Sequence, residues 1–185
     1  MSYTKISSIH EYLGKQVSIA GWLYNKRSSG KLQFLQVRDG SETIQCVVVK
    51  NEVDEATFAT AEKLTQESSI VVTGTIREDK RSRLGFEIGV QKIELIQLSD
   101  EFPISKKDHG TAFLMDNRHL WLRSSKQHAI IRIRATIVKS IRDYLDSHGF
   151  INVDTPIFTP SACEGTTTLF ETNYFDRKAY LAQSG

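Results

Sequence analysis

The chain has 185 residues, with 24 Lys and Arg against 22 Asp and Glu, so its formal net charge is +2. Hydrophobic residues make up 39% and charged residues 25%, which is typical of globular domains and excludes a disordered or collagen-like chain. No apolar run approaches the ~20 residues of a membrane span, and the near-neutral charge excludes a wholly electrostatic nucleic-acid binder. Two cysteines, Cys46 and Cys163, are too few for a disulfide framework and indicate free thiols in a reducing cytosol.

The first ~100 residues carry the alternating pattern of β-strands. Gly30 and Gly40 lie in two of the turns between them, where glycine can supply a positive φ. A segment with helical spacing separates the third strand from the fourth. Three strands, one helix and two strands is the order of a five-stranded all-β OB-fold barrel, which we predict for residues 1–100. The strands are expected at 16–20, 32–37, 43–49, 70–76 and 86–96, and the helix at 53–68.

From residue 101 onward the pattern changes. Residues 100–116 are polar without a clear period, and we interpret 101–123 as a linker. Residues 125–148 carry isoleucines, valine and leucine at spacings of three and four, which predicts a long amphipathic helix. A short strand at 151–156, a polar loop and a hairpin should follow.

These last elements are too few to close a hydrophobic core, because a two-stranded hairpin is marginal in water by itself. We therefore expect residues 124–185 to be the incomplete beginning of an α+β domain with an antiparallel sheet. The protein would then be part of a longer chain, or would fold with a partner. The alternative is a small α+β subdomain that simply ends there.

Three side chains on or between the first three predicted strands are candidates for binding nucleic acid: Arg27, Phe34 and Gln45. An exposed aromatic ring on an OB sheet is a stacking platform for an unpaired base, while a nearby amide can read a base edge and an arginine can hold phosphate. Residues 24–38 add four bases and no acid, a local charge of +4. The alternative is that Phe34 belongs to the barrel core and the basic residues form a solvated rim.

Two loops are further candidates. Residues 77–83 carry four bases and two acids in the position of a loop that OB folds use to grip oligonucleotides, or they are a solvated turn. Residues 161–168 place one carboxylate, Glu164, among small residues and fit a lid over a small cationic group, or an ordinary polar surface loop. Cys163 has no neighbouring base in the sequence, and the histidine spacings match no metal motif, so we predict neither a thiol nucleophile nor a metal site.

The chain resembles class II aminoacyl-tRNA synthetases of the aspartate, asparagine and lysine subclass, most closely the bacterial-type asparaginyl enzymes. The resemblance spans essentially the whole chain, and Trp121 and the SACEGTT loop at 161–167 are similar to the asparaginyl version rather than the aspartyl one. Its strongest pieces are GWLYNKR at 21–27, FLQVRD at 34–39, FPISKKDHG at 102–110, RHLWLR at 118–123 and GFINVDTP at 149–156.

The resemblance implies three regions: an OB-fold anticodon-binding domain at 1–100, a hinge at 101–123 and the start of a class II catalytic domain at 124–185. Phe34 would stack on the central anticodon uridine, with Arg27 and Gln45 contacting that base or its surroundings.

In the second half, the resemblance makes the helix at 125–148 and the strand ending at Pro156 motif 1 of the family, which builds the homodimer interface. Glu164 would belong to the loop that closes over the amino acid, and Ser184 would line the amino-acid site. Motifs 2 and 3, with most ligands of ATP and Mg²⁺, lie beyond Gly185 in the family. We therefore expect this 185-residue chain by itself not to activate asparagine.

The implied function is that of an asparagine–tRNA ligase, a cytoplasmic homodimer without membrane association. It would attach asparagine to tRNA(Asn) through asparaginyl-adenylate, with ATP as substrate and Mg²⁺ as cofactor. One alternative is an aspartate–tRNA ligase, including one relaxed in its choice of tRNA. Another is a stand-alone OB module that binds RNA or single-stranded DNA.

Overall fold

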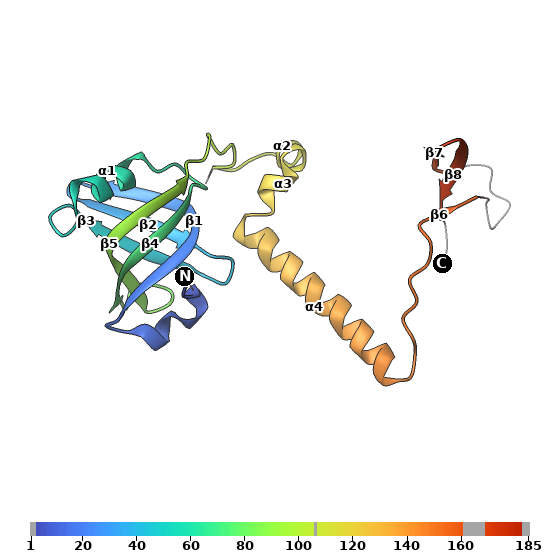
Figure 1. The fold of residues 1–185 in the computed structure, drawn as a ribbon, viewed down its shortest axis with the longest axis horizontal. Coiled ribbons are helices and arrows are strands. Elements are labelled where there is room, and N and C mark those ends of the chain that lie inside the picture. The colour runs from blue at the N-terminus through green and yellow to red at the C-terminus, as the bar shows by residue number, and fades with distance from the viewer. Residues whose placement is uncertain (1–2, 106, 161–168, 183–185) are drawn as a thin grey trace. The chain divides into compact units, whose positions relative to one another are not determined.

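The computed structural model describes residues 3–105, 107–160 and 169–182. The chain divides into two compact units, residues 1–109 and 110–185 (Figure 1). Each unit is described by itself below.

The first unit is a closed barrel of five strands in the order β1-β2-β3-β5-β4 (Figure 1). The strands β3 and β5 pair in parallel, and the other neighbours pair antiparallel. Closure pairs the edge strands with each other, so the sheet has no free edge. The predicted OB-fold barrel is confirmed. The strands are β1 (Gln16–Ser29), β2 (Leu32–Arg38), β3 (Thr43–Val49), β4 (Ser69–Glu78) and β5 (Phe86–Gln97).

Alternation along the strands builds the barrel core. In β2, for example, Leu35 and Val37 are fully buried while Gln36 between them is partly exposed. Helix α1 (Glu55–Lys63) lies between β3 and β4 in the chain and adds Phe58 and Ala61 to the same core. The Asp54 carboxylate accepts a hydrogen bond from the backbone N–H of Thr57 at 2.7 Å, which fixes the start of α1. The helix is shorter than the predicted 53–68, because Leu64 leaves the helical conformation.

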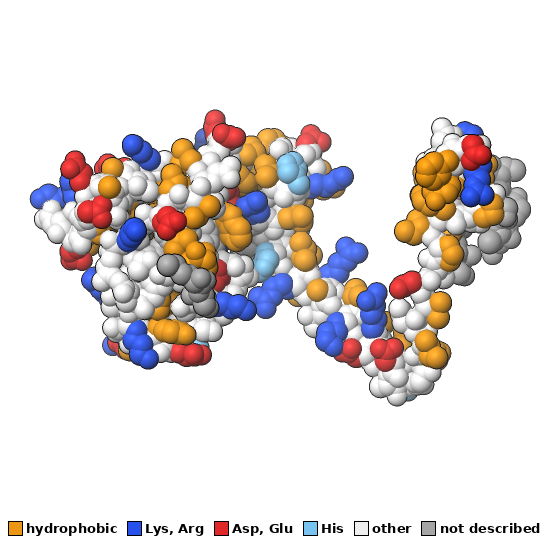
Figure 2. Space-filling view, viewed as in Figure 1, with side chains coloured by type: hydrophobic (Ala, Val, Ile, Leu, Met, Phe, Trp, Pro, Cys, Tyr) orange, Lys and Arg blue, Asp and Glu red, His pale blue; other side chains and the backbone are white. Residues whose placement is uncertain are grey.

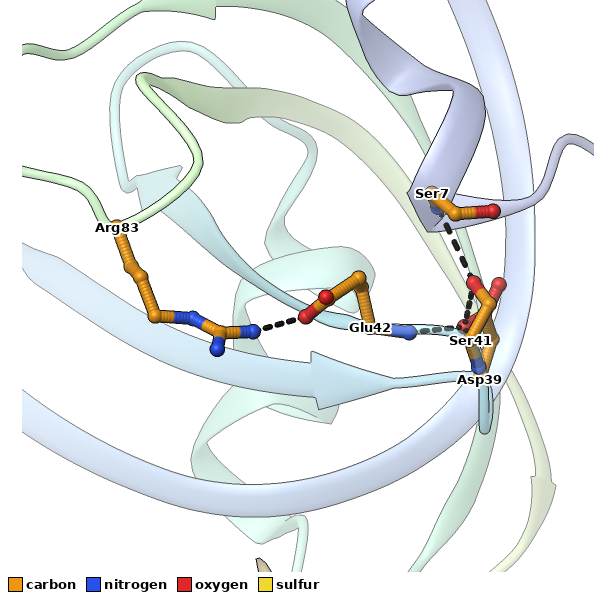
Figure 3. Close-up of polar contacts among 5 residues, drawn as sticks. All are labelled: Ser7, Asp39, Ser41, Glu42 and Arg83. Carbon is orange, nitrogen blue, oxygen red and sulfur yellow. Dashed lines mark hydrogen bonds and ion pairs between the residues drawn. The ribbon is translucent and has the colours of Figure 1, made fainter. Parts of the chain in front are cut away.

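A short 3₁₀ helix, η1 (Ile6–Tyr12), was not predicted from the sequence. Ile6 and Ile9 are 1% and 2% exposed and belong to the barrel core. Backbone N–H groups at the start of η1 are satisfied by the turn between β2 and β3. The backbone N–H of Ile6 donates to Asp39 Oδ2 at 2.8 Å. The backbone N–H of Ser7 donates to Ser41 Oγ at 3.1 Å (Figure 3). A tertiary contact therefore supplies the cap that the local sequence lacks.

The region predicted to be a linker, 101–123, has more structure than expected. It contains two short helices, α2 (Thr111–Asp116) and α3 (Arg118–Trp121). Its first residues are joined to the turn before β4, since Gln66 Nε2 donates to the carbonyl of Ile104 at 3.5 Å. Helix α2 begins just after Gly110, and its segment 112–115 is Ala-Phe-Leu-Met, in which alanine, leucine and methionine are good helix formers.

The second unit starts its long helix, α4, where the sequence predicts one. Helix α4 runs over Ser125–Ser147, and Ser124 Oγ accepts the N–H of Gln127 at 3.4 Å. The predicted hairpin also forms, as two strands of a three-stranded antiparallel sheet in the order β6-β8-β7 (Figure 1). The strands of this sheet are β6 (Phe158–Thr159), β7 (Glu171–Tyr174) and β8 (Arg177–Leu181).

The prediction of a strand at 151–156 is wrong. Those residues have no regular secondary structure, and Ile151 is 87% exposed. A strand needs a neighbour to satisfy its backbone N–H and C=O groups, and none of the strands in the described residues pairs with this segment.

The apolar stripe of α4 is uncovered within the described residues. Ile133, Ile137 and Ile141 are 61%, 54% and 55% exposed. Figure 2 shows hydrophobic, basic and acidic side chains interspersed along this helix. In the part of the chain that the structure describes, no helix is long and apolar enough to cross a membrane.

Candidate nucleic-acid interface

Phe34 lies on the outer surface of the barrel. Its two neighbours in β2, Gln33 and Leu35, are buried at 3% and 0% exposure, whereas Phe34 is partly exposed. Since successive side chains of a strand point to opposite faces, the ring faces outward. The sequence left open whether Phe34 belongs to the barrel core or faces outward. The structure shows that it faces outward, so the core interpretation is wrong.

Arg27 is the cross-strand neighbour of Phe34. The two residues are Cα partners between β1 and β2, and the guanidinium carbon of Arg27 lies 4.6 Å from the centroid of the Phe34 ring. This is a cation–π contact. A base arriving at the ring must displace the guanidinium or stack beside it, and arginine planes themselves stack on bases. The structure thus brings together two of the residues predicted for this site.

Gln45 lies on the same outer surface, two positions before the cross-strand partner of Phe34. Gln45 is partly exposed between the buried Ile44 and Cys46, and its Nε2 donates to Glu87 Oε2 at 3.2 Å. Glu87 is a residue that the sequence analysis missed. It enters through the parallel pairing of β3 with β5, which joins residues 42 positions apart in the chain. The signal that could have identified Glu87 from the sequence is its outward position in the predicted fifth strand.

The neighbouring thiol has no role in this surface. Cys46 points into the barrel, where burial, reinforced by the nearby charge of Glu87, raises the pKa of its thiol well above its usual range. The thiol is therefore neutral and packs as a small apolar side chain.

The cluster of basic residues at 24–38 is less available than the sequence predicts. Lys26 Nζ donates to the backbone carbonyl of Glu62 at 2.6 Å, at the end of α1. Burial lowers the pKa of Lys26, and the charge of Glu62 partly offsets this. Arg38 forms an ion pair with Glu67, whose side chain is 4% exposed. Two of the four predicted cations are thus engaged within the barrel, which leaves Arg27 and Lys31 on the surface.

The loop between β4 and β5 has a similar arrangement. Arg81 pairs with Asp79 at 3.2 Å, and Arg83 pairs with Glu42 in the turn between β2 and β3 (Figure 3). Arg77 pairs with Glu52 at 3.5 Å, and its guanidinium occupies the space that a Cβ on Gly89 would need. Carboxylates of the barrel therefore offset much of the positive charge of this loop.

In the second unit, Pro156 lies in the exposed segment after α4 that has no regular structure. Glu164 and Ser184, the residues expected in an amino-acid pocket, lie outside the described residues, as does Cys163. Within the residues described, the features of this unit that bear on function are thus the uncovered stripe of α4 and the hairpin sheet.

Comparison with known proteins finds a matching family model for each of the two units. The family model for the OB-fold nucleic acid binding domain matches residues 17–96. The family model for class II tRNA synthetases (D, K and N) matches residues 110–185. An OB barrel with an outward aromatic, followed by this second domain, is the combination that the chain shares with class II tRNA synthetases of the D, K and N group.

Several of the similar proteins are asparagine enzymes. The asparagine–tRNA ligase of Chloroflexus aurantiacus is 55% identical over 181 residues, which are 97% of this chain and 41% of that protein. The crystal structure of the asparaginyl-tRNA synthetase from Pyrococcus horikoshii, complexed with asparaginyl-adenylate, superposes with a TM-score of 0.90 at 40% identity. That match covers 100% of this chain and 43% of the other. The chain thus spans about two fifths of the length of these relatives.

An aspartyl relative has the same fold. A crystal structure of a putative aspartyl-tRNA synthetase from Leishmania major superposes with a TM-score of 0.81 at 23% identity, over 99% of this chain and 39% of that one. The fold is therefore shared by proteins named for either amino acid.

Proposed function

We propose that the protein of which this chain forms all or part is an asparagine–tRNA ligase, and that its barrel binds the anticodon loop of tRNA(Asn). The observation that carries the anticodon role is the outward Phe34 ring, with Arg27 at 4.6 Å and the Gln45–Glu87 pair on the same surface. The ring can stack an unpaired base, and the amide and carboxylate can read the edge of that base. Identity of 55% to an asparagine enzyme supports the choice of amino acid.

In the proposed reaction, the carboxylate of asparagine attacks the α-phosphate of ATP, which forms asparaginyl-adenylate and releases pyrophosphate. A hydroxyl of the terminal ribose of the tRNA then takes the acyl group and releases AMP. We propose that Glu164 and Ser184 contribute to the amino-acid pocket, as the resemblance implies, and that the enzyme works in the cytoplasm. Catalysis of this kind depends on positioning and on stabilisation of the charge that develops at phosphate.

Mg²⁺ belongs to this family's chemistry, but the described residues do not form a site for it. Among them, no three His, Cys, Asp or Glu side chains lie close enough together to hold a metal ion. We propose that this part of the chain contributes tRNA binding and dimer assembly.

We further propose that α4 and the segment ending at Pro156 form the homodimer interface. The support is the exposed apolar stripe of α4, because contiguous apolar surface of this kind marks interaction sites. Analytical ultracentrifugation should show concentration-dependent dimers, and Ile137→Asp should abolish them. A chain that stays monomeric at high concentration would contradict this assignment.

The anticodon role can be tested with the 185-residue chain and a stem-loop RNA carrying a GUU anticodon. Phe34→Ala should weaken binding by about 1–3 kcal/mol, or roughly 5- to 150-fold in Kd, because a stacked base is lost. A matched control is Phe175→Ala, which removes an aromatic ring that is 89% exposed in the hairpin sheet and should leave Kd unchanged.

The two alternative functions give different results in the same experiments. A stand-alone nucleic-acid module would bind unrelated single strands as tightly as the GUU stem-loop. An aspartate enzyme would charge tRNA with aspartate when the complete protein is supplied with both amino acids. Unchanged affinity of Phe34→Ala for the stem-loop would remove the main support for the anticodon role.

A further inference from the structure

The outer surface of β1, β2 and β3 carries a second row of polar side chains beside the row that contains Phe34. Asn25, Gln36 and Gln45 are successive Cα partners across the three strands. The row of Arg27, Phe34 and Val47 lies beside this amide row. It is two residues later in β1 and β3 and two residues earlier in β2, because β2 runs antiparallel to the other two strands. The surface therefore places a row with an aromatic platform beside a row of three amides.

The alignment of the amide row depends on an irregularity in β1. The register with β2 shifts between Leu23 and Asn25, so that Tyr24 is an extra residue in β1. Without this bulge, Asn25 would not face Gln36. Bulges of this kind re-aim side chains and are common beside functional sites.

The amides of Asn25 and Gln36 are available to a ligand. Both residues are partly exposed, and among the described residues neither side-chain amide is hydrogen-bonded to another protein group. Gln45 differs, because its Nε2 is already directed at Glu87. Each free amide offers a carbonyl acceptor and an NH₂ donor, the combination that matches the Watson–Crick edge of a nucleobase.

The distance between the rows suits an adjacent nucleotide. Two residues along a strand span about 6.4–6.8 Å, which is enough to place a neighbouring, unstacked base over the amide row while another base covers Phe34. Single-stranded RNA is read in this way, with some bases stacked on aromatic rings and others hydrogen-bonded on their edges.

We propose that Asn25 and Gln36 together read the base next to the one stacked on Phe34. The inference rests on the proposed anticodon role of the barrel and adds two specificity-determining residues to it. The ligand group is the Watson–Crick edge of one flanking base of an RNA loop, and the contact is made by neutral amides rather than by charge. Binding through this row should therefore depend on base identity and only weakly on salt.

The test measures Kd of the 185-residue chain for stem-loops in which each of the three anticodon bases is substituted in turn. The unmodified chain should discriminate at one flanking position, and Asn25→Ala and Gln36→Ala should each reduce that discrimination by about fivefold, the worth of one or two neutral hydrogen bonds. Discrimination at the central position should persist in both variants. Gln36→Met, which keeps the length of the side chain without its amide, should behave as Gln36→Ala does.

Gln91→Ala is the matched control. Gln91 is an exposed glutamine of β5 whose amide contacts Gln16 and Thr75 rather than the outer surface of β1, β2 and β3, and its loss should leave all Kd values unchanged. Circular dichroism and thermal unfolding of each variant would show that the barrel is folded.

Two results would overturn the inference. Unchanged discrimination at both flanking positions in the two alanine variants would show that the amides are not read. An equal loss of affinity for every stem-loop, without a change in discrimination, would show a contact that does not specify a base. In either case, a large loss of binding in Phe34→Ala would leave the anticodon role intact, whereas no loss in that variant would mean that the proposed function itself fails.

Discussion

The barrel and helix α4 are built from similar isoleucine- and valine-rich segments, but only in the barrel are these apolar side chains buried. Ile19, Leu35 and Val72 in the barrel are 0% exposed, while Ile133 and Ile137 in α4 are 61% and 54% exposed. The barrel strands pair in a closed ring that buries one side chain in two. The helix satisfies its own backbone hydrogen bonds and forms with its apolar stripe uncovered. Secondary structure thus follows the local pattern in both regions, whereas burial follows only where the rest of the layer is present.

The largest expected difference between the regions is in how much each apolar side chain contributes to the free energy of unfolding. Leu35→Ala should lower the free energy of unfolding of the barrel by about 2–5 kcal/mol, because it leaves a cavity in a packed core. At protein concentrations low enough to keep the chain monomeric, Ile137→Ala in α4 should change it by less than about 0.5 kcal/mol, as for an exposed site. Urea unfolding followed by Trp22 fluorescence, with Trp121 replaced by Phe, measures both. Equal losses would mean that the stripe of α4 is covered in solution, and a dependence on protein concentration would identify a second copy as the cover.

A second expected difference concerns pH. Burial alone would raise the pKa of Asp39, but hydrogen bonds from the backbone of Ile6, from the Ser41 hydroxyl and from the backbone N–H groups of Glu42 and Ser41 outweigh burial and lower that pKa. The stabilisation is therefore present above the unfolded pKa, about 3.9, and is lost as pH falls through the folded value.

Asp39→Asn should accordingly destabilise the barrel by about 1–2 kcal/mol near neutral pH, a figure that allows for partial exposure to solvent. The difference from the unmodified chain should shrink as the pH is lowered to about 3, because below about pH 3.9 the unfolded state binds a proton more readily than the folded state does. Urea unfolding of both proteins at the two pH values measures this. A difference that stays constant with pH would show that the carboxylate charge does not contribute.

The helix caps should sharpen the comparison with a smaller effect. Asp54→Ala in α1 should lower the midpoint of thermal unfolding of the barrel by about 5 °C, because α1 packs on the core. Ser124→Ala removes the corresponding cap of α4 and should reduce only the helical circular dichroism signal. The barrel midpoint should stay unchanged in Ser124→Ala, and a shared shift would show that the two units unfold together.

The surface ion pairs should have the smallest effect. Arg83→Ala removes the pair with Glu42 in the barrel, and Lys139→Ala removes the pair with Asp143 one turn along α4. Exposed pairs contribute about 0–1 kcal/mol to stability. Arg83→Ala should therefore change the free energy of unfolding of the barrel by about 0.5 kcal/mol or less, and Lys139→Ala should cause only a slight loss of helicity in α4. Unfolding curves at low and high salt provide the measurement. A loss above about 1 kcal/mol in Arg83→Ala would make its loop an integral part of the barrel.

Much of the fold could be predicted from the sequence, because periods of two and of three to four residues are local signals. Four of the barrel strands, α1 and α4 are present close to their predicted positions, whereas β1 begins as predicted but continues beyond residue 20 to Ser29. Helix η1 could not be predicted, because its first N–H groups are capped by Asp39 and Ser41, more than 30 residues away. The predicted strand at 151–156 did not form, because a strand depends on a partner that a local pattern does not specify.

The candidate site was predictable in part for the same reason. Phe34, Arg27 and Gln45 stand out as residue types at alternating positions, but alternation alone did not decide whether the ring faces the core or the solvent. Glu87 was missed, because only the parallel pairing of β3 with β5 brings it to Gln45. The basic residues were overestimated, since a count of charges does not show that Lys26 caps a helix or that Arg38 pairs with Glu67.

The sequence by itself determined the OB barrel, the helix after it and the resemblance to class II tRNA synthetases, because these depend on residue types at fixed spacing. Only the tertiary structure decided which face of β2 is outward, which cations are engaged within the barrel and which amides line up across the bulge at Tyr24. Those properties depend on strand register and on pairings between residues distant in the chain. A shift of one residue would turn each of these side chains to the opposite face of the sheet.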